Sequence, residues 1–149
     1  MNIANFLTKD EQAQIVTAIE AAEMVTTGEI RVHIESHCKG SAQERAAFLF
    51  HKLNMENTKE RNGVLIYIAF QSRHFAIFGD TRITAHLSAD LWKGITDQIH
   101  TSFAKKDFCG GICRAIFSVG NQLAKIFPYK AGDTNELPND ISFGDCRGE

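Results

Sequence analysis

Two carboxylates and one amide stand beside predicted strands and could hold a metal ion. Glu29 opens an alternating segment, Asn62 precedes an apolar run over residues 63–70, and Asp80 follows a second apolar run. Oxygen ligands of this kind suit hard cations such as calcium or magnesium. The sequence therefore predicts a divalent-cation site at Glu29 and Asp80, with Asn62 as an optional ligand, where a phosphate oxygen could be polarised. The alternative is an ion pair that links one of these carboxylates to Arg61.

Basic side chains offer a second kind of chemistry, the binding of a phosphate or another anion. Arg73 and His37 are predicted at the carboxyl ends of two parallel strands, where open α/β sheets commonly bind ligands. Arg61 is predicted at the other end of the sheet. An arginine can hold such an anion through two parallel hydrogen bonds. A solvated hairpin tip is the alternative for Arg73. The sequence has no nucleophile elbow, P-loop or dinucleotide fingerprint, so no catalytic residue is assigned.

These polar residues are positioned by an alternation of helices and strands. Capping boxes at 8–11 and 41–44 begin two helices, and apolar stripes at helical spacing predict two more from about 88 to 103 and 108 to 127. Residues 29–35 alternate strictly, as in a strand with one wetter face. Residues 61–80 are typical of a buried strand, a tight turn and an antiparallel strand.

The order of these elements predicts the fold class. A strand, a helix and a strand over residues 29–70 form a right-handed crossover between parallel strands. We therefore expect an α/β protein, an α/β/α sandwich with a small mixed, Rossmann-like sheet. A single domain is expected over residues 1–128, followed by an acidic C-terminal tail over 129–149 that is mostly loop. In this topology Gly28, Glu29, Arg61, Asn62 and Asp80 gather at one pole, and Glu35, Ser36, His37 and Arg73 gather at the other.

The composition of the chain indicates which kinds of partner it could bind and where in the cell it is expected. The 149 residues carry a net charge of −2 without a basic stripe, which argues against nucleic-acid binding. No signal peptide and no apolar stretch of about 18 residues is visible, so we expect a cytoplasmic protein without direct membrane insertion. The four cysteines are expected as free thiols; Cys109 and Cys113 with Cys38 or His37 could alternatively bind zinc, although the usual spacing is absent.

The chain also resembles a known family, the TPM domain proteins. This family takes its name from a thylakoid lumen phosphatase-like protein, a photosystem II repair protein and a nicotinic receptor modulator. The resemblance covers nearly the whole chain, and its specificity comes from the order and spacing of short pieces. These pieces are Leu7–Glu11, Ala21–Ile34 with Thr27-Gly28-Glu29-Ile30, Arg61–Ala69, Arg73, Gly79-Asp80, Trp92, Phe108 with Gly110–Ile112, and Asn135–Ser142.

The resemblance implies an α/β/α sandwich with a small mixed sheet. It further implies divalent-cation binding in some members, weak acid phosphatase activity in a plant member, and roles in membrane-protein repair or receptor modulation. Bacterial members often occur near membrane proteins of the LemA type, which makes a membrane protein an expected partner. Three positions depart from the family pattern: Ser72 before the hairpin arginine, Arg82 two residues after Gly-Asp, and Thr84 in place of a common glutamate. A basic Arg82 would compete with a cation near Asp80.

Two functions follow from different classes of protein. The first is a binding or adaptor module, with or without a divalent cation, that assists membrane-protein maintenance or repair. The second is a weak metal-assisted acid phosphatase in which Glu29 and Asp80 hold the cation and Arg61 or Arg73 holds the phosphate. The absence of a catalytic motif favours the first.

Overall fold

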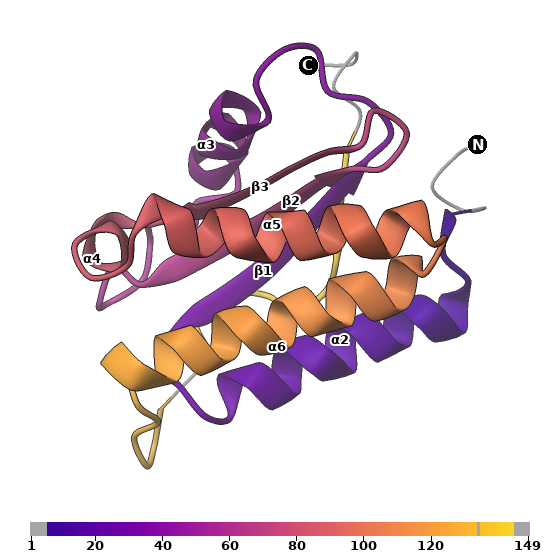
Figure 1. The fold of residues 1–149 in the computed structure, drawn as a ribbon. Coiled ribbons are helices and arrows are strands. Elements are labelled where there is room, and N and C mark those ends of the chain that lie inside the picture. The colour runs from indigo at the N-terminus through magenta and orange to yellow at the C-terminus, as the bar shows by residue number, and fades with distance from the viewer. Residues whose placement is uncertain (1–5, 134, 145–149) are drawn as a thin grey trace.

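The computed structural model describes residues 6–133 and 135–144 (Figure 1). Helices and strands alternate in the predicted order. They are α2 (Lys9–Glu23), β1 (Glu29–Glu35), α3 (Ala42–Lys52), β2 (Gly63–Ala69), β3 (His74–Gly79), α4 (Thr81–Thr84), α5 (Ala89–Ala104), α6 (Phe108–Ile126) and β4 (Ser142–Phe143). The α/β fold class predicted from the sequence is therefore confirmed.

The helices begin where capping residues stand. The side chains of Thr8, Ser41 and Ser88 accept hydrogen bonds from backbone N–H groups in the first turns of α2, α3 and α5. At Thr8 the capping box is complete, because the Glu11 carboxylate also accepts from the Thr8 N–H. These bonds satisfy N–H groups that have no partner within the helix.

The sheet has four strands in the order β3-β2-β1-β4. Strand β1 pairs in parallel with β2, Glu29 opposite Gly63, and β2 pairs antiparallel with β3, Val64 opposite Gly79. The crossover through α3 and the hairpin were both predicted. Two elements were not: the single turn α4, which Asp80 caps, and the two-residue strand β4 in the segment expected as loop.

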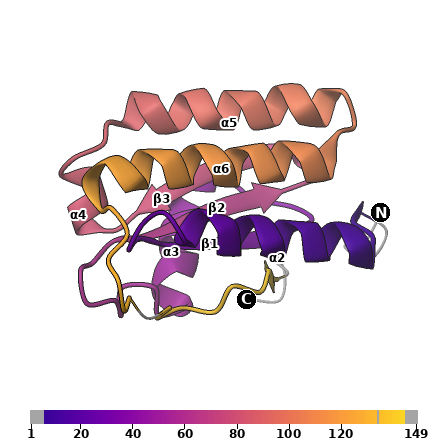
Figure 2. The same ribbon diagram turned by 90° about the horizontal axis from the view of Figure 1, so that it is seen from below.

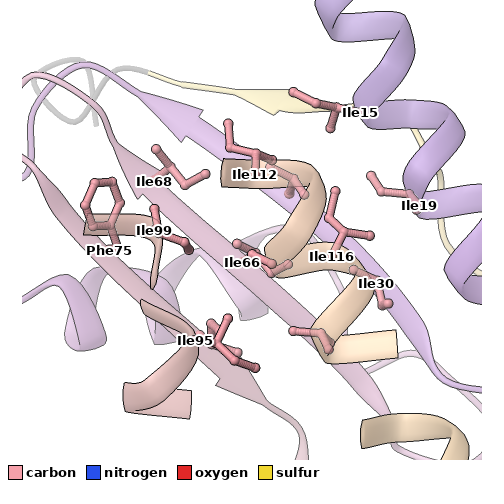
Figure 3. Close-up of a cluster of buried hydrophobic side chains, with 14 of the residues drawn as sticks. Ile15, Ile19, Ile30, Ile66, Ile68, Phe75, Ile95, Ile99, Ile112 and Ile116 are labelled. Atoms are coloured by element: carbon pink, nitrogen blue, oxygen red, sulfur yellow. The ribbon is translucent and has the colours of Figure 1, made fainter. Parts of the chain in front are cut away.

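Helices cover both faces of the sheet (Figure 2). Helices α2, α5 and α6 pack on one face around a cluster of branched aliphatic side chains that Figure 3 shows between the helices and the strands. Helix α3 packs on the other face against Leu65, Tyr67 and Ala76, and the C-terminal segment adds Leu137 on that side. The even-numbered residues of β1 point into the first core, so Glu29, Arg31, His33 and Glu35 all point toward the second face.

Close helix packing explains two glycines of α6. A Cβ atom at Gly120 would lie 2.8 Å from the Cβ of Ala22 on α2, and one at Gly111 would lie 2.6 Å from the Cβ of Ser102 on α5. Both distances are shorter than a carbon–carbon contact allows, so these positions let α6 approach its two neighbours. Within the described residues, none of the helices is long and apolar enough to cross a membrane.

Candidate functional site

Two glutamates meet where α2 ends and β1 begins. Glu23 closes α2, and its Oε2 accepts a hydrogen bond from the Ile30 N–H at 2.8 Å. Glu29 opens β1, and its Oε1 accepts from the Glu136 N–H at 2.6 Å. The two carboxyl groups interact, and each shifts the pKa of the other. Two ionised carboxylates in one site repel each other, which favours a proton on one of them.

Burial and mutual repulsion hold that proton at neutral pH. Burial raises the pKa of Glu23 to about 9, and the neighbouring charges of Glu29 and Asp133 add to the effect. Burial also raises the pKa of Glu29, with Glu136 and Asp133 contributing in the same direction. Two carboxyl groups in one site cannot both ionise without a large cost. The pair therefore carries one proton, mainly on Glu23.

These glutamates line a cavity of about 310 Å³, which we call the acidic pocket. Its walls are Glu20, Glu23, Met24, Gly28, Glu29, Tyr129, Asp133, Asn135 and Asn139. Glu23 Oε1 and Asn139 Oδ1 are buried and have no hydrogen-bond partner within residues 6–133 and 135–144. Buried polar atoms are normally paired, so two unpaired oxygens in one pocket require an explanation. Among the described residues no group of three or more His, Cys, Asp or Glu side chains is arranged to hold a metal.

Asp80, the other carboxylate of the predicted metal site, forms an ion pair. Its two carboxylate oxygens accept hydrogen bonds from Arg61 Nε at 2.8 Å and Nη2 at 2.9 Å, and Oδ1 also caps the Thr81 N–H. This is the ion pair that the sequence left open as an alternative to a metal site. The bonds and charge of Asp80 raise the pKa of Arg61. Strand β2 separates Asp80 on the β3 side from Glu29 on β1, although both lie at the predicted pole.

Asn62 and Arg82 lie near this pole but face other groups. Asn62 is buried, its Nδ2 donates to Thr27 Oγ1 at 3.4 Å, and its Oδ1 has no partner in the part of the chain that the structure describes. Arg82 lies 3.9 Å from the Glu60 carboxylate and over the Phe127 ring at 5.4 Å. The positive charge that would compete with a metal ion at Asp80 is therefore that of Arg61 and not that of Arg82.

The opposite pole holds the residues expected to bind an anion. Arg73 adopts a left-handed backbone conformation with φ 57° at the hairpin tip, and its guanidinium lies 5.6 Å from the ring centres of both Phe103 and Phe108. His37 is exposed. The Ser36 carbonyl accepts from the Gln71 N–H, so the two loops do meet as predicted. Arg73 thus packs on aromatic rings, where its charge interacts with their π faces.

A second set of polar residues lies in the interior, and we call it the buried ionic cluster: His33, Glu35, Arg45, Tyr67 and Ser142. The Glu35 carboxylate accepts from Arg45 Nε and Nη2, both at 2.9 Å, and from the Tyr67 hydroxyl. His33 Nε2 lies 3.1 Å from Glu35 Oε1, and its Nδ1 lies 2.9 Å from Ser142 Oγ. Burial would raise the pKa of Glu35, but the bonds from His33, Arg45 and Tyr67 outweigh it and lower the pKa to about 2.

Sequence reasoning missed Glu23 and Asn139 and most of the buried ionic cluster. A signal for Glu23 existed: it follows Ile15 and Ile19 at the same helical spacing, so it continues the buried stripe of α2. Tyr67 sits in an otherwise apolar run, where its hydroxyl needs a partner. The cysteines that the structure describes, Cys38, Cys109 and Cys113, are free, and burial beside Cys113 raises the pKa of Cys109 to about 12. Cys146 lies outside the described residues.

Proteins of known structure share this architecture. The NMR structure of the BA42 protein from the psychrophilic bacterium Bizionia argentinensis superposes with a TM-score of 0.87 at 44% identity, covering 95% of this chain and 98% of that one. The N-terminal domain of the cg2496 protein from Corynebacterium glutamicum superposes with a TM-score of 0.62 at 13% identity, covering 91% and 84%, and supports the fold alone. No curated protein matches the chain. The TPM domain matches residues 1–122, and the chain therefore belongs to the TPM domain family.

Proposed function

We propose that this TPM domain is a binding module whose acidic pocket takes a divalent cation. Glu23 and Glu29 supply the two carboxylates, and Asn139 supplies an amide oxygen. Calcium or magnesium is the expected ion. The membrane-protein partner implied by the family, of the LemA type or another, and the cytoplasmic location both stay predictions.

The observation that carries this proposal is two unpaired, buried oxygens beside two neighbouring glutamates. Among the described residues Glu23 Oε1 and Asn139 Oδ1 have no hydrogen-bond partner, and burial raises the pKa of Glu23 to about 9. A cation in the pocket would replace the proton and satisfy both oxygens. It would also neutralise the repulsion between Glu29 and its acidic neighbours.

The type of ligand favours calcium. Calcium accepts six to eight oxygens at varied angles, including carboxylates, amides and water, whereas magnesium requires a tighter octahedron and releases water reluctantly. The pocket offers carboxylates from α2 and β1 and amides from the C-terminal segment. Such a set, drawn from separate segments, is easier to arrange around the larger ion.

A calorimetric titration of metal-stripped full chain with calcium and then magnesium tests the proposal. We expect saturable binding that releases close to one proton at pH 7, measured from the heats in buffers of different ionisation enthalpy. Glu23→Gln and Glu29→Gln should remove the binding. Asp80→Asn is the control, because Asp80 is held by Arg61 on the far side of β2.

The possible outcomes separate the two ligand sets. Loss of binding in Asp80→Asn but not in Glu23→Gln would favour the pair Glu29 and Asp80 instead. No heat at millimolar metal, with no change in amide NMR shifts at residues 23–30, would overturn the proposal.

The weak phosphatase is the less supported function. Its phosphate-binding arginines are committed elsewhere, Arg61 to Asp80 and Arg73 to the rings of Phe103 and Phe108. We expect no divalent-dependent hydrolysis of p-nitrophenyl phosphate above the buffer rate. Turnover that requires the metal and falls in Glu29→Gln would instead establish the phosphatase.

A further inference from the structure

The outer edge of β3 pairs with no other strand among the described residues and lies in a groove. Within that part of the chain β3 is the first strand of the sheet and pairs on its β2 side alone. Asp80 N–H donates to the Gly63 carbonyl, so the antiparallel register turns the peptide groups of His74, Ala76 and Phe78 toward β2. The N–H and C=O groups of Phe75, Ile77 and Gly79 therefore point outward.

The outward groups lack backbone partners within the part of the chain that the structure describes. One side-chain hydrogen bond reaches these outward groups. Gln43 Nε2 of α3 donates to the Ile77 carbonyl at 3.4 Å, close to the limit for a hydrogen bond. Natural proteins usually block long edges with charges, proline or bulges. Phe75, Ala76 and Ile77 carry none of these, and all three are buried apolar residues.

Helices form the two walls of the groove. Figure 1 shows α3 and α5 on opposite sides of β3. The groove measures about 450 Å³ and is lined by Gln43 of α3, by Phe75, Ala76 and Ile77 of β3, and by Ala89, Trp92, Lys93 and Thr96 of α5. The edge is thus recessed between Gln43 on the α3 side and a mixed wall on the α5 side, where Ala89 and Trp92 are apolar and Lys93 and Thr96 are polar.

We propose that this groove binds an extended peptide segment of a partner protein, which adds to β3 as a fifth strand. Strand addition uses the free backbone groups for affinity and the flanking walls for specificity. Successive side chains of an extended peptide point to opposite faces. The peptide recognised here therefore alternates: apolar residues face Ala89 and Trp92, and polar residues face Gln43.

The size of the edge argues for a peptide rather than a second copy of this chain. A six-residue strand is ~20 Å long, and at ~10 Å width it offers ~200 Å² per partner, against ~800 Å² per partner in a stable protein–protein interface. The edge of a second copy would also be recessed between its own α3 and α5. A single extended chain enters such a groove without that obstruction.

The test begins with random dodecapeptides displayed on phage and selected on the immobilised full chain. The most enriched peptide is synthesised and titrated into ¹⁵N-labelled protein. We expect amide shifts centred on Phe75, Ile77 and Gly79, slower hydrogen exchange at these three amides, and a fluorescence change at Trp92, the single tryptophan of the sequence. Failure to enrich any peptide, or shifts centred elsewhere, would overturn the proposal.

Two matched comparisons test the mode of binding. N-methylation of the alternate peptide amides that face β3 should abolish binding, whereas methylation of the other alternate set should leave it within about threefold. In the protein, Thr96→Arg should weaken binding at least tenfold by filling the groove. Gln98→Arg, on an exposed position of the same helix, should not change it.

Two other results would contradict the addition of a partner peptide to β3. Equal binding of both methylated peptides would exclude strand addition. A concentration-dependent dimer in sedimentation that Thr96→Arg dissociates would assign the groove to a second copy instead of a partner peptide. The acidic pocket lies at a different place, so neither result depends on cation binding.

Discussion

Strand β1 carries a buried glutamate at each end, and the two have opposite electrostatics. Glu29 at the first position is 2% exposed, and Glu35 at the last position is 0% exposed. Both side chains point to the same face of the sheet. The pKa of Glu29 is raised by burial, whereas hydrogen bonds and a cation lower the pKa of Glu35 to about 2 despite its burial.

The difference lies in the neighbours that each glutamate meets. Glu35 faces a two-pronged arginine, a tyrosine hydroxyl and a histidine, while Glu29 faces a second glutamate and a single backbone N–H. Burial disfavours the charged form in both places, so the partners decide the outcome. The carboxylate of Glu35 is fully hydrogen-bonded, whereas no positively charged side chain among the described residues bonds to Glu29, the place where we propose that a cation binds.

Removing the charge of Glu35 should have the largest effect. Glu35→Gln removes the charge of a buried carboxylate that accepts hydrogen bonds from Arg45 and Tyr67, so we expect the free energy of unfolding to fall by about 3–5 kcal/mol. Urea denaturation at pH 7 measures this loss. The exposed Glu44→Gln on α3 is the control and should change stability by less than about 1 kcal/mol. Equal effects of both variants would show that the buried ionic cluster does not stabilise the fold.

Acid should reveal the same cluster in the unmodified chain. The folded-state pKa of Glu35, about 2, is below its ordinary value of 4.5, so its stabilisation is complete above pH 4.5 and is lost as the pH falls toward 2. At about 1.4 kcal/mol per pKa unit the loss is about 3 kcal/mol. Denaturation across this pH range measures it, and Glu35→Gln should flatten the curve. An unchanged slope in that variant would assign acid unfolding to other groups.

Glu23→Gln should stabilise the metal-free chain. Because the folded-state pKa of Glu23 is about 9, the fold binds a proton that the unfolded chain releases, and stability falls as the pH rises from 4.5 to 9. Glutamine mimics the protonated form, so we expect a gain of about 1–3 kcal/mol at pH 7.5. Thermal unfolding with and without calcium checks this, with the exposed Glu20→Gln of the same pocket as the matched variant. Destabilisation by Glu23→Gln would contradict the shared proton.

The smallest effect is expected at Tyr67. Tyr67→Phe removes one hydrogen bond to the Glu35 carboxylate but leaves the arginine in place, so we expect a loss of about 1–2 kcal/mol. The pKa of Glu35 should rise, which would move acid unfolding to higher pH. A loss as large as that of Glu35→Gln would mean that the hydroxyl, and not the arginine, holds the carboxylate.

Much of the fold followed from local signals in the sequence. The capping residues Thr8, Ser41 and Ser88 begin their helices as predicted, and the polar break after Phe70 makes the hairpin. Alternation in residues 29–35 separated the two faces of β1 correctly, but the face expected to be wetter is buried under α3 and the C-terminal segment, with Glu29, His33 and Glu35 at most 2% exposed. Strand β4 escaped prediction because two residues carry no periodicity.

The partners of each charge could not be predicted in the same way. Glu29 was expected with Asp80, but which side chains meet across a strand depends on how α2 and the C-terminal segment pack, which local patterns do not encode. Arg61 was correctly proposed as an alternative partner of Asp80. Glu23 could have been found, because a carboxylate that continues a buried helical stripe must meet another polar group.

The most direct test follows the carboxyl ¹³C shifts of Glu23, Glu29 and Glu35 from pH 2 to pH 10, without and with calcium. In metal-free protein we expect Glu35 to stay ionised down to about pH 2 and Glu23 to keep its proton up to about pH 9. Calcium should then release that proton at neutral pH and leave Glu35 unchanged. If all three groups titrate near pH 4.5, or if calcium leaves Glu23 protonated, the contrast between the two ends of β1 is wrong.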